Sequence, residues 1–251
     1  MKNKTFITKH EHQRCQVVKD TFEPLLNPEN YHISDCGKFG FCLFDEFIKG
    51  SFQSSELYQH AEDLFLSLLD CYKSDYIYNH YKAANPGKPC PDNLEEAITR
   101  QEKKELKQSC DKIRKETEQK WKQIENQFLW ELLMAAHDII QENPNDDILY
   151  SPKHGYYYSS VCWHNGYYSN SSDAPINSAE DMLKYLETIW AWNDYQRYNL
   201  KYYVPDINEI LKDLQANLPE EEWKKETLRR TEAMKPFREM AEHYYSSPDL
   251  H

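Results

Sequence analysis

The chain has 251 residues and carries 30 Lys and Arg against 42 Asp and Glu, so its formal net charge at pH 7 is −12. With 39% hydrophobic residues it can bury a sizeable core, so folding requires neither a disulfide framework nor a structural metal. No stretch approaches the roughly 18 to 20 apolar residues of a membrane-spanning helix, and the N-terminal residues lack a signal-peptide core. We therefore expect a cytoplasmic protein with no membrane partner. The acidic balance disfavours a general nucleic-acid binder, whose affinity depends on Lys and Arg that neutralise phosphates.

The first part of the chain shows helical, then strand-like, then helical patterns. Apolar residues at helical spacing predict a helix over 6–26, which ends at an Asn-Pro pair. Alternation followed by an apolar run over 31–47 predicts a hairpin whose second strand is buried. Apolar residues three and four positions apart predict a core helix from Ser54 or Ser55 to about Tyr81.

The middle of the chain predicts one long helix. Residues 93–143 contain neither proline nor glycine, so a continuous helix there would be about 75 Å long. Between residues 99 and 120 the only large apolar residues are Leu106 and Ile113, whereas the second half is rich in Trp, Phe, Leu and Ile. We therefore expect a helical arm over 93–120 that projects into solvent or lies against another chain, and a buried second half. A partial heptad seam in this arm covers too few turns to establish a coiled coil.

Helix start signals recur in the last part of the chain. Ser178, with an acidic residue three positions later, forms a capping box, and Asp206 does the same for the next helix. Pro219, followed by three glutamates, is typical of a first helical position. Pro236 is expected to bend or restart that helix, which leaves a short terminal helix to Tyr245.

Together these patterns predict a predominantly α-helical α+β fold. Asn165-Gly166 suits the turn of a second hairpin, to which residues 148–150 add a third strand. We expect five to seven helices, a small antiparallel sheet built from the two hairpins, and a long protruding helix. The segments 1–92, 93–143 and 144–251 are expected to form one cooperative domain.

Few residues suggest catalysis or ligand binding. The seven cysteines contain no Cys-x-x-Cys pair and are interpreted as free thiols of a reducing cytosol. Cys36 and Cys42 span the first hairpin and could lie near each other, but no second pair completes a metal site, so two small buried residues are the simpler interpretation. Six glycines leave no phosphate-cradling loop. We expect neither a metal nor a cofactor.

One short motif suggests an enzyme. Arg238 and His243 lie on a predicted helix near the end of a mostly helical chain, with four residues between them. This six-residue stretch resembles the active-site motif of HEPN ribonucleases. The resemblance implies that Arg238 and His243 act on an RNA 2′-hydroxyl and phosphate across a dimer, with a cation that stabilises the phosphorane and an imidazole that exchanges protons. Glu239 departs from the polar residue expected after the arginine, and a solvated, salt-bridged helix surface is the alternative.

Two surfaces are candidates for binding. Alternation along the second hairpin places half of its aromatic residues on each sheet face, and the exposed half would offer Tyr156, Tyr158, Trp163 and Tyr167 to a partner. The ordinary interpretation of these rings is cross-strand packing beneath adjacent helices. The stretch 100–122 holds nine Lys and Arg against five acids. The basic side chains proposed to bind there are Lys103, Lys107 and Arg114.

The sequence thus favours a non-catalytic, intracellular protein-binding or regulatory protein that docks onto another protein through its helical arm and tyrosines. A HEPN-like ribonuclease that uses Arg238 and His243 is one alternative. The other is an RNA-contacting protein that uses the basic stretch 100–122, whose affinity would fall steeply with salt. The oligomeric state does not follow from the sequence.

Overall fold

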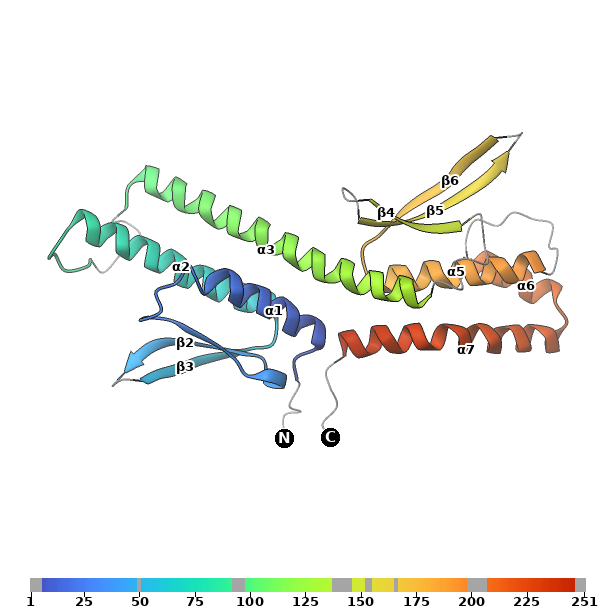
Figure 1. Cartoon of the computed structure of the whole chain (residues 1–251), viewed down its shortest axis with the longest axis horizontal. Helices are drawn as coiled ribbons and strands as arrows, with labels where there is room; N and C mark the ends of the chain where they lie inside the picture. The colour runs from blue at the N-terminus through green and yellow to red at the C-terminus, as the bar shows by residue number, and fades with distance from the viewer. Residues whose placement is uncertain are drawn as a thin grey trace. The chain divides into compact units, whose positions relative to one another are not determined.

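The computed structural model describes residues 6–48, 51–91, 98–136, 146–151, 155–164, 167–197 and 207–246. These ranges hold six α-helices and two antiparallel three-stranded sheets, which confirms a predominantly α-helical α+β fold (Figure 1). The chain divides into two compact units. Unit 1 comprises Met1–Ile124 and His243–His251, and unit 2 comprises Glu125–Glu242. The sequence predicts one small sheet from both hairpins, and this is wrong, because each hairpin gains a third strand and forms a sheet of its own unit.

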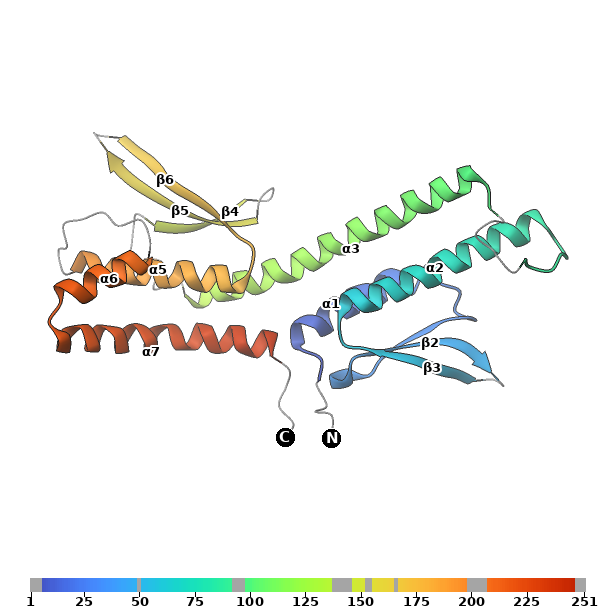
Figure 2. The ribbon, with the colours of Figure 1, turned by 180° about the vertical axis from the view of Figure 1, so that it is seen from behind.

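Unit 1 combines helices with the first sheet. Its elements are α1 (Lys9–Phe22), β1 (His32–Asp35), a 3-10 turn (Gly37–Phe39), β2 (Phe41–Ile48), β3 (Ser51–Tyr58), α2 (Ala61–Ala84) and the first part of α3 (Arg100–Ala135). The strand order is β1-β2-β3, and α1 and α2 lie on one face of this sheet (Figure 2). The hydroxyl of Thr8 accepts a hydrogen bond from the Glu11 amide at 3.0 Å and so caps α1.

Strand β3 corrects the predicted start of the core helix. Residues from Ser54 onward form a strand, and α2 begins only at Ala61. Leu57 fits helical spacing, but it pairs with Cys42 and is half exposed, whereas its neighbour Tyr58 is buried. This alternation has the period of a strand. Strand β2 has two edges, and β3 provides the second partner that its backbone groups require.

The core of unit 1 is aromatic at its centre. The rings of Phe22 and Phe65 meet edge to face at 5.4 Å, and Phe65 meets Trp121 at 6.1 Å. The indole nitrogen of Trp121 donates a hydrogen bond to the Arg14 carbonyl oxygen at 3.0 Å. Helices α1, α2 and α3 are therefore joined through one continuous set of contacts.

The first half of α3 packs within unit 1 and does not project alone into solvent. Ile113 and Trp121 belong to the main core, and Leu106 packs with Ile77 of α2. Thr117 is also fully buried. Spacings of seven, four and four residues place these side chains on one helix face, so a few apolar residues suffice to hold a helix that is otherwise polar. The expected arm is thus a long helix, as predicted, whose narrow apolar seam is covered by its own chain.

Unit 2 contains the remaining elements. They are the last part of α3, β4 (Asp146–Ser151), β5 (Gly155–His164), β6 (Tyr167–Ile176), α5 (Ala179–Arg197), α6 (Ile207–Asn217) and most of α7 (Glu220–Tyr245). The strand order β4-β5-β6 confirms the predicted hairpin and its third strand. The capping box is also confirmed, because the Asp181 amide donates to the Ser178 hydroxyl at 3.2 Å. The turn at Asn165-Gly166 and the start at Asp206 lie outside the described residues.

Helix α7 corrects the predicted restart at Pro236 and the separate terminal helix after it. The helix is continuous from Glu220 to Tyr245, with Pro236 inside it. Proline removes one helical hydrogen bond. Met234 and Phe237, on either side of the proline, are both buried, and burial of a helix face favours a continuous helix.

Two glycines in the turn between β1 and β2 allow the backbone geometry of this turn to be tested with a matched pair of variants. Gly40 has φ +111°, and a Cβ there would lie 2.1 Å from the Tyr58 carbonyl oxygen. Gly37 has φ +60° and open space around it. Gly40→Ala should therefore lower the free energy of unfolding by about 3 kcal/mol or more, and Gly37→Ala by about 1 to 2 kcal/mol. Urea denaturation followed by circular dichroism measures both, and equal losses would contradict the close approach at Gly40.

Candidate docking surface on the long helix

One exposed face of α3 carries most of its positive charge. We define the basic ridge as Arg100, Lys104, Lys107, Asp111, Lys115, Glu118 and Lys122, all of which are exposed. Because they lie three or four positions apart, they form one stripe about 33 Å long. Five cations against two anions give the ridge a net charge of +3, in a chain whose net charge is −12.

Among the described residues, three of the ridge lysines differ from the adjacent Lys112 and Arg114 in having no anionic partner. Within the described part of the chain, Lys104, Lys107 and Lys115 form no ion pair. By contrast, Lys112 pairs with Glu116 at 3.8 Å, and Arg114 lies 3.9 Å from Glu118. No described residue therefore neutralises these three lysines through an ion pair.

Arg114, which the sequence proposes as a binding residue, braces unit 1. Its Nη1 lies 2.8 Å from each carboxylate oxygen of Glu62 on α2. Its guanidinium lies 4.1 Å from the centre of the Phe65 ring. Of the other proposed basic residues, Lys107 is on the ridge and Lys103 is exposed beside it. Lys103 and Lys107 are thus exposed, whereas the Arg114 side chain contacts Glu62 and Phe65 and so joins α3 to α2.

A capping box fixes the first turn of α3. The Thr99 amide and hydroxyl each lie 2.7 Å from Glu102 Oε2, and the Glu102 amide donates to the Thr99 hydroxyl at 3.2 Å. These bonds from Thr99, aided by His80, lower the pKa of Glu102. This helix start is absent from the sequence predictions, although Thr99 and Glu102 have the capping-box spacing.

The tyrosines of the second sheet are only partly available. Tyr156 and Tyr158 are 5% and 8% exposed, and the Tyr158 ring stacks on Tyr185 of α5 at 4.7 Å. Burial raises the pKa of Tyr156. Their proposed role as exposed contacts is therefore corrected: both lie on the buried face of the sheet, where cross-strand and helix packing cover them. The side chains of Trp163 and Tyr167 lie outside the described residues, and Tyr150 on β4 is exposed.

The two residues of the ribonuclease-like motif have different surroundings. Arg238 pairs with Glu187 of α5 at 3.1 Å. Both line a hollow of about 340 Å³ in unit 2, together with Lys212 and the buried Arg230. His243 is exposed and is not among the residues that line this hollow. Arg238 thus lines a hollow that His243 does not line.

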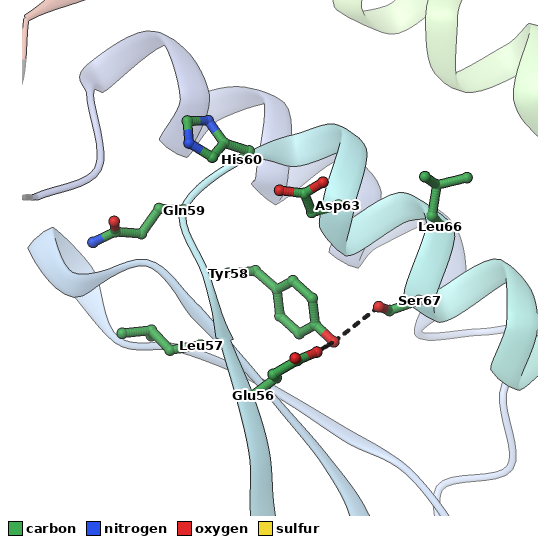
Figure 3. A pocket seen from close by; sticks show the side chains of 8 residues that line it. All are labelled: Glu56, Leu57, Tyr58, Gln59, His60, Asp63, Leu66 and Ser67. Atoms are coloured by element: carbon green, nitrogen blue, oxygen red, sulfur yellow. Dashed lines mark hydrogen bonds between the residues drawn. The ribbon is translucent and has the colours of Figure 1, made fainter.

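A second hollow lies in unit 1 where β3 meets α2, in the segment predicted as helix. It measures about 460 Å³ and is lined by Glu56, Leu57, Tyr58, Gln59, His60, Asp63, Leu66 and Ser67 (Figure 3). The Tyr58 hydroxyl lies 2.7 Å from Glu56 Oε2 and 2.8 Å from Ser67 Oγ. Burial, with the nearby Glu56, raises the pKa of Tyr58 to about 12. Tyr58 therefore stays protonated near neutral pH and ties the strand to α2.

The described residues contain no metal site and no helix suited to a bilayer. Nowhere in those ranges do three or more His, Cys, Asp or Glu side chains gather as metal ligands. Every helix in the same ranges is too short or too polar to cross a membrane. No known protein family, curated protein or solved structure matches this chain.

Alanine variants of Arg114 and Lys107 test whether Arg114 stabilises unit 1 while Lys107 does not. Arg114→Ala removes the Glu62 contact and the Phe65 stacking, so we expect the free energy of unfolding to fall by about 1 to 2 kcal/mol. Lys107→Ala should change it by less than about 0.5 kcal/mol, because Lys107 is exposed and contacts no anion. Urea unfolding measures both variants. A neutral effect of Arg114→Ala would show that the ion pair and stacking contribute nothing.

Proposed function

We propose that the chain is a non-catalytic protein-binding or regulatory protein whose unit 1 docks through the basic ridge onto an acidic surface of another protein. The observation that carries the proposal is the set of exposed, unpaired lysines on the ridge, namely Lys104, Lys107 and Lys115. Charges left without partners in the described chain are available to a partner without the breaking of internal pairs.

The ridge is also held in place before any partner arrives. Leu106, Ile113 and Trp121 anchor the opposite face of the helix, and Arg114 ties its side to α2. A helix that is already ordered loses little backbone entropy when it binds. This distinguishes the ridge from a loose charged tail, which would have to order on binding.

Charge favours a protein partner over RNA. The chain as a whole carries −12, and fields of like sign oppose the approach of a polyanion that extends beyond the ridge. Asp111 and Glu118 also interrupt the row of cations. An acidic patch on a protein can match the three lysines without meeting the rest of the negative surface, so specificity arises from the local pattern.

Neutralising the ridge tests this function. Replacing Lys104, Lys107 and Lys115 with Gln preserves helix propensity and changes the net charge from −12 to −15. Because each close charge pair at a surface contributes up to about 1 kcal/mol, we expect affinity for a poly-L-glutamate peptide to fall about tenfold or more. Fluorescence anisotropy of the labelled peptide measures the affinity, with single-stranded RNA of equal charge as the competing probe.

The matched control makes the same charge change elsewhere. Lys224, Lys225 and Lys235 are exposed on α7, and their replacement by Gln should leave peptide affinity unchanged. Equal losses in both variants would mean that net charge alone governs binding, which contradicts a docking site on the ridge. Tighter, ridge-dependent binding of the RNA would support an RNA-contacting protein instead. RNA cleavage that disappears in both Arg238→Ala and His243→Ala would support the ribonuclease and contradict the proposal.

A further inference from the structure

Two cysteines of the first sheet lie in contact. The Sγ atoms of Cys36 and Cys42 are 3.4 Å apart. Cys36 follows β1 directly, and Cys42 lies on β2 opposite Ser34. The Cys36 amide donates a hydrogen bond to the Gly40 carbonyl oxygen at 2.8 Å, which closes the turn between them. Both cysteines are only partly buried, so the pair lies near the protein surface.

The backbone of the turn sets this distance. Gly37 and Gly40 both have positive φ, and Gly40 has no room for a side chain beside Tyr58. The Asp35 carboxylate accepts a hydrogen bond from the Gly37 amide at 2.8 Å and lies 3.0 Å from His12 Nε2. The two sulfurs are therefore held together by a defined turn and its neighbours. A disulfide needs a sulfur separation of about 2.0 Å, so small side-chain rotations would close the gap.

We propose that Cys36 and Cys42 form a dithiol–disulfide exchange site in unit 1, whose oxidant is a small disulfide such as glutathione disulfide. No part of the proposed docking function depends on this site. Cys15 illustrates the contrast with a structural thiol, because it is fully buried, whereas Cys36 and Cys42 are only partly buried. Burial raises the pKa of Cys15 to about 12, and burial together with the nearby Cys42 also raises the pKa of Cys36.

The exchange balances in two steps. One cysteine loses its proton, and its thiolate attacks a sulfur of glutathione disulfide, which breaks that bond and releases one glutathione. The second cysteine then loses its proton and attacks the protein sulfur of the mixed disulfide, which forms the Cys36–Cys42 bond and releases the second glutathione. Two electrons pass to the oxidant, and the two released protons end on the two glutathione thiols.

Oxidation would lock a turn that other segments touch. The Ile7 amide donates to the Lys38 carbonyl oxygen at 3.1 Å, and Gln59 Nε2 donates to the Phe39 carbonyl oxygen at 3.3 Å. Gln59 also lines the hollow between β3 and α2. The disulfide would thus fix the turn that holds the N-terminal segment and one wall of this hollow.

Mass spectrometry of the full chain tests the exchange site. The native protein is equilibrated in buffers of varied glutathione and glutathione disulfide, quenched with acid, treated with N-ethylmaleimide and digested with trypsin. Trypsin cuts after Lys38, so a Cys36–Cys42 disulfide joins peptide 20–38 to peptide 39–49. We expect this joined species to rise from absent to predominant as the buffer becomes more oxidising, and to disappear after dithiothreitol.

Single-cysteine variants provide the control. In Cys36→Ser and Cys42→Ser the remaining thiol should stop at the mixed disulfide with glutathione, and no joined peptide should form. The proposal is overturned if native wild-type protein keeps both cysteines alkylated or glutathionylated in the most oxidising buffer. It is also overturned if the joined species appears only after the chain is unfolded in urea. The wild-type result decides the matter even if a variant fails to fold.

Discussion

The packing of Trp121 sets the orientation of α3 within unit 1. Its ring meets Phe65, its indole nitrogen binds the Arg14 carbonyl oxygen, and the Arg14 guanidinium lies 4.4 Å from its ring centre. A buried Trp of this kind contributes about 3 to 5 kcal/mol relative to Ala. Because a helix is rigid, fixing one side chain of α3 on the core also fixes the direction of every position of the ridge.

The narrow apolar face of α3, formed by Leu106, Ile113 and Trp121, explains how a polar helix stays folded. Most of the first half of α3 is charged, and an isolated helix of that composition would be marginal in water. Packing of one narrow face supplies the missing stability, and Arg114 adds a contact at its edge. On the opposite face, Lys104, Lys107 and Lys115 are exposed and form no ion pair among the described residues, so their replacement would not disturb the core.

The sequence predicts those elements whose signals are local. The capping box at Ser178 and the long stretch without proline or glycine around α3 give correct helices, because these signals depend on near neighbours. Strand β3 is wrongly predicted as helix, because Leu57 fits helical spacing and only pairing with Cys42 reveals the strand. The restart predicted at Pro236 is also wrong, because α7 continues through this position, near which Met234 and Phe237 are buried.

The candidate site is predictable only in part, for a similar reason. The charge pattern identifies the stretch that contains Lys107, but only the tertiary contacts show that Arg114 faces Glu62 and is occupied. Likewise, alternation places Tyr156 and Tyr158 on one face of the sheet, but it does not say which face α5 covers. Periodicity tells which residues share a face, whereas the partner of that face depends on the whole fold.

Hydrogen–deuterium exchange along α3 tests most directly whether this helix is clamped within unit 1. We predict that amides of residues 104–121 exchange as slowly as those of residues 64–77 in α2, because both helices belong to one packed core. A helix standing alone would fray and exchange fast. Rapid exchange over 104–121, with α2 still protected, would contradict this packing and remove the rigid support of the ridge.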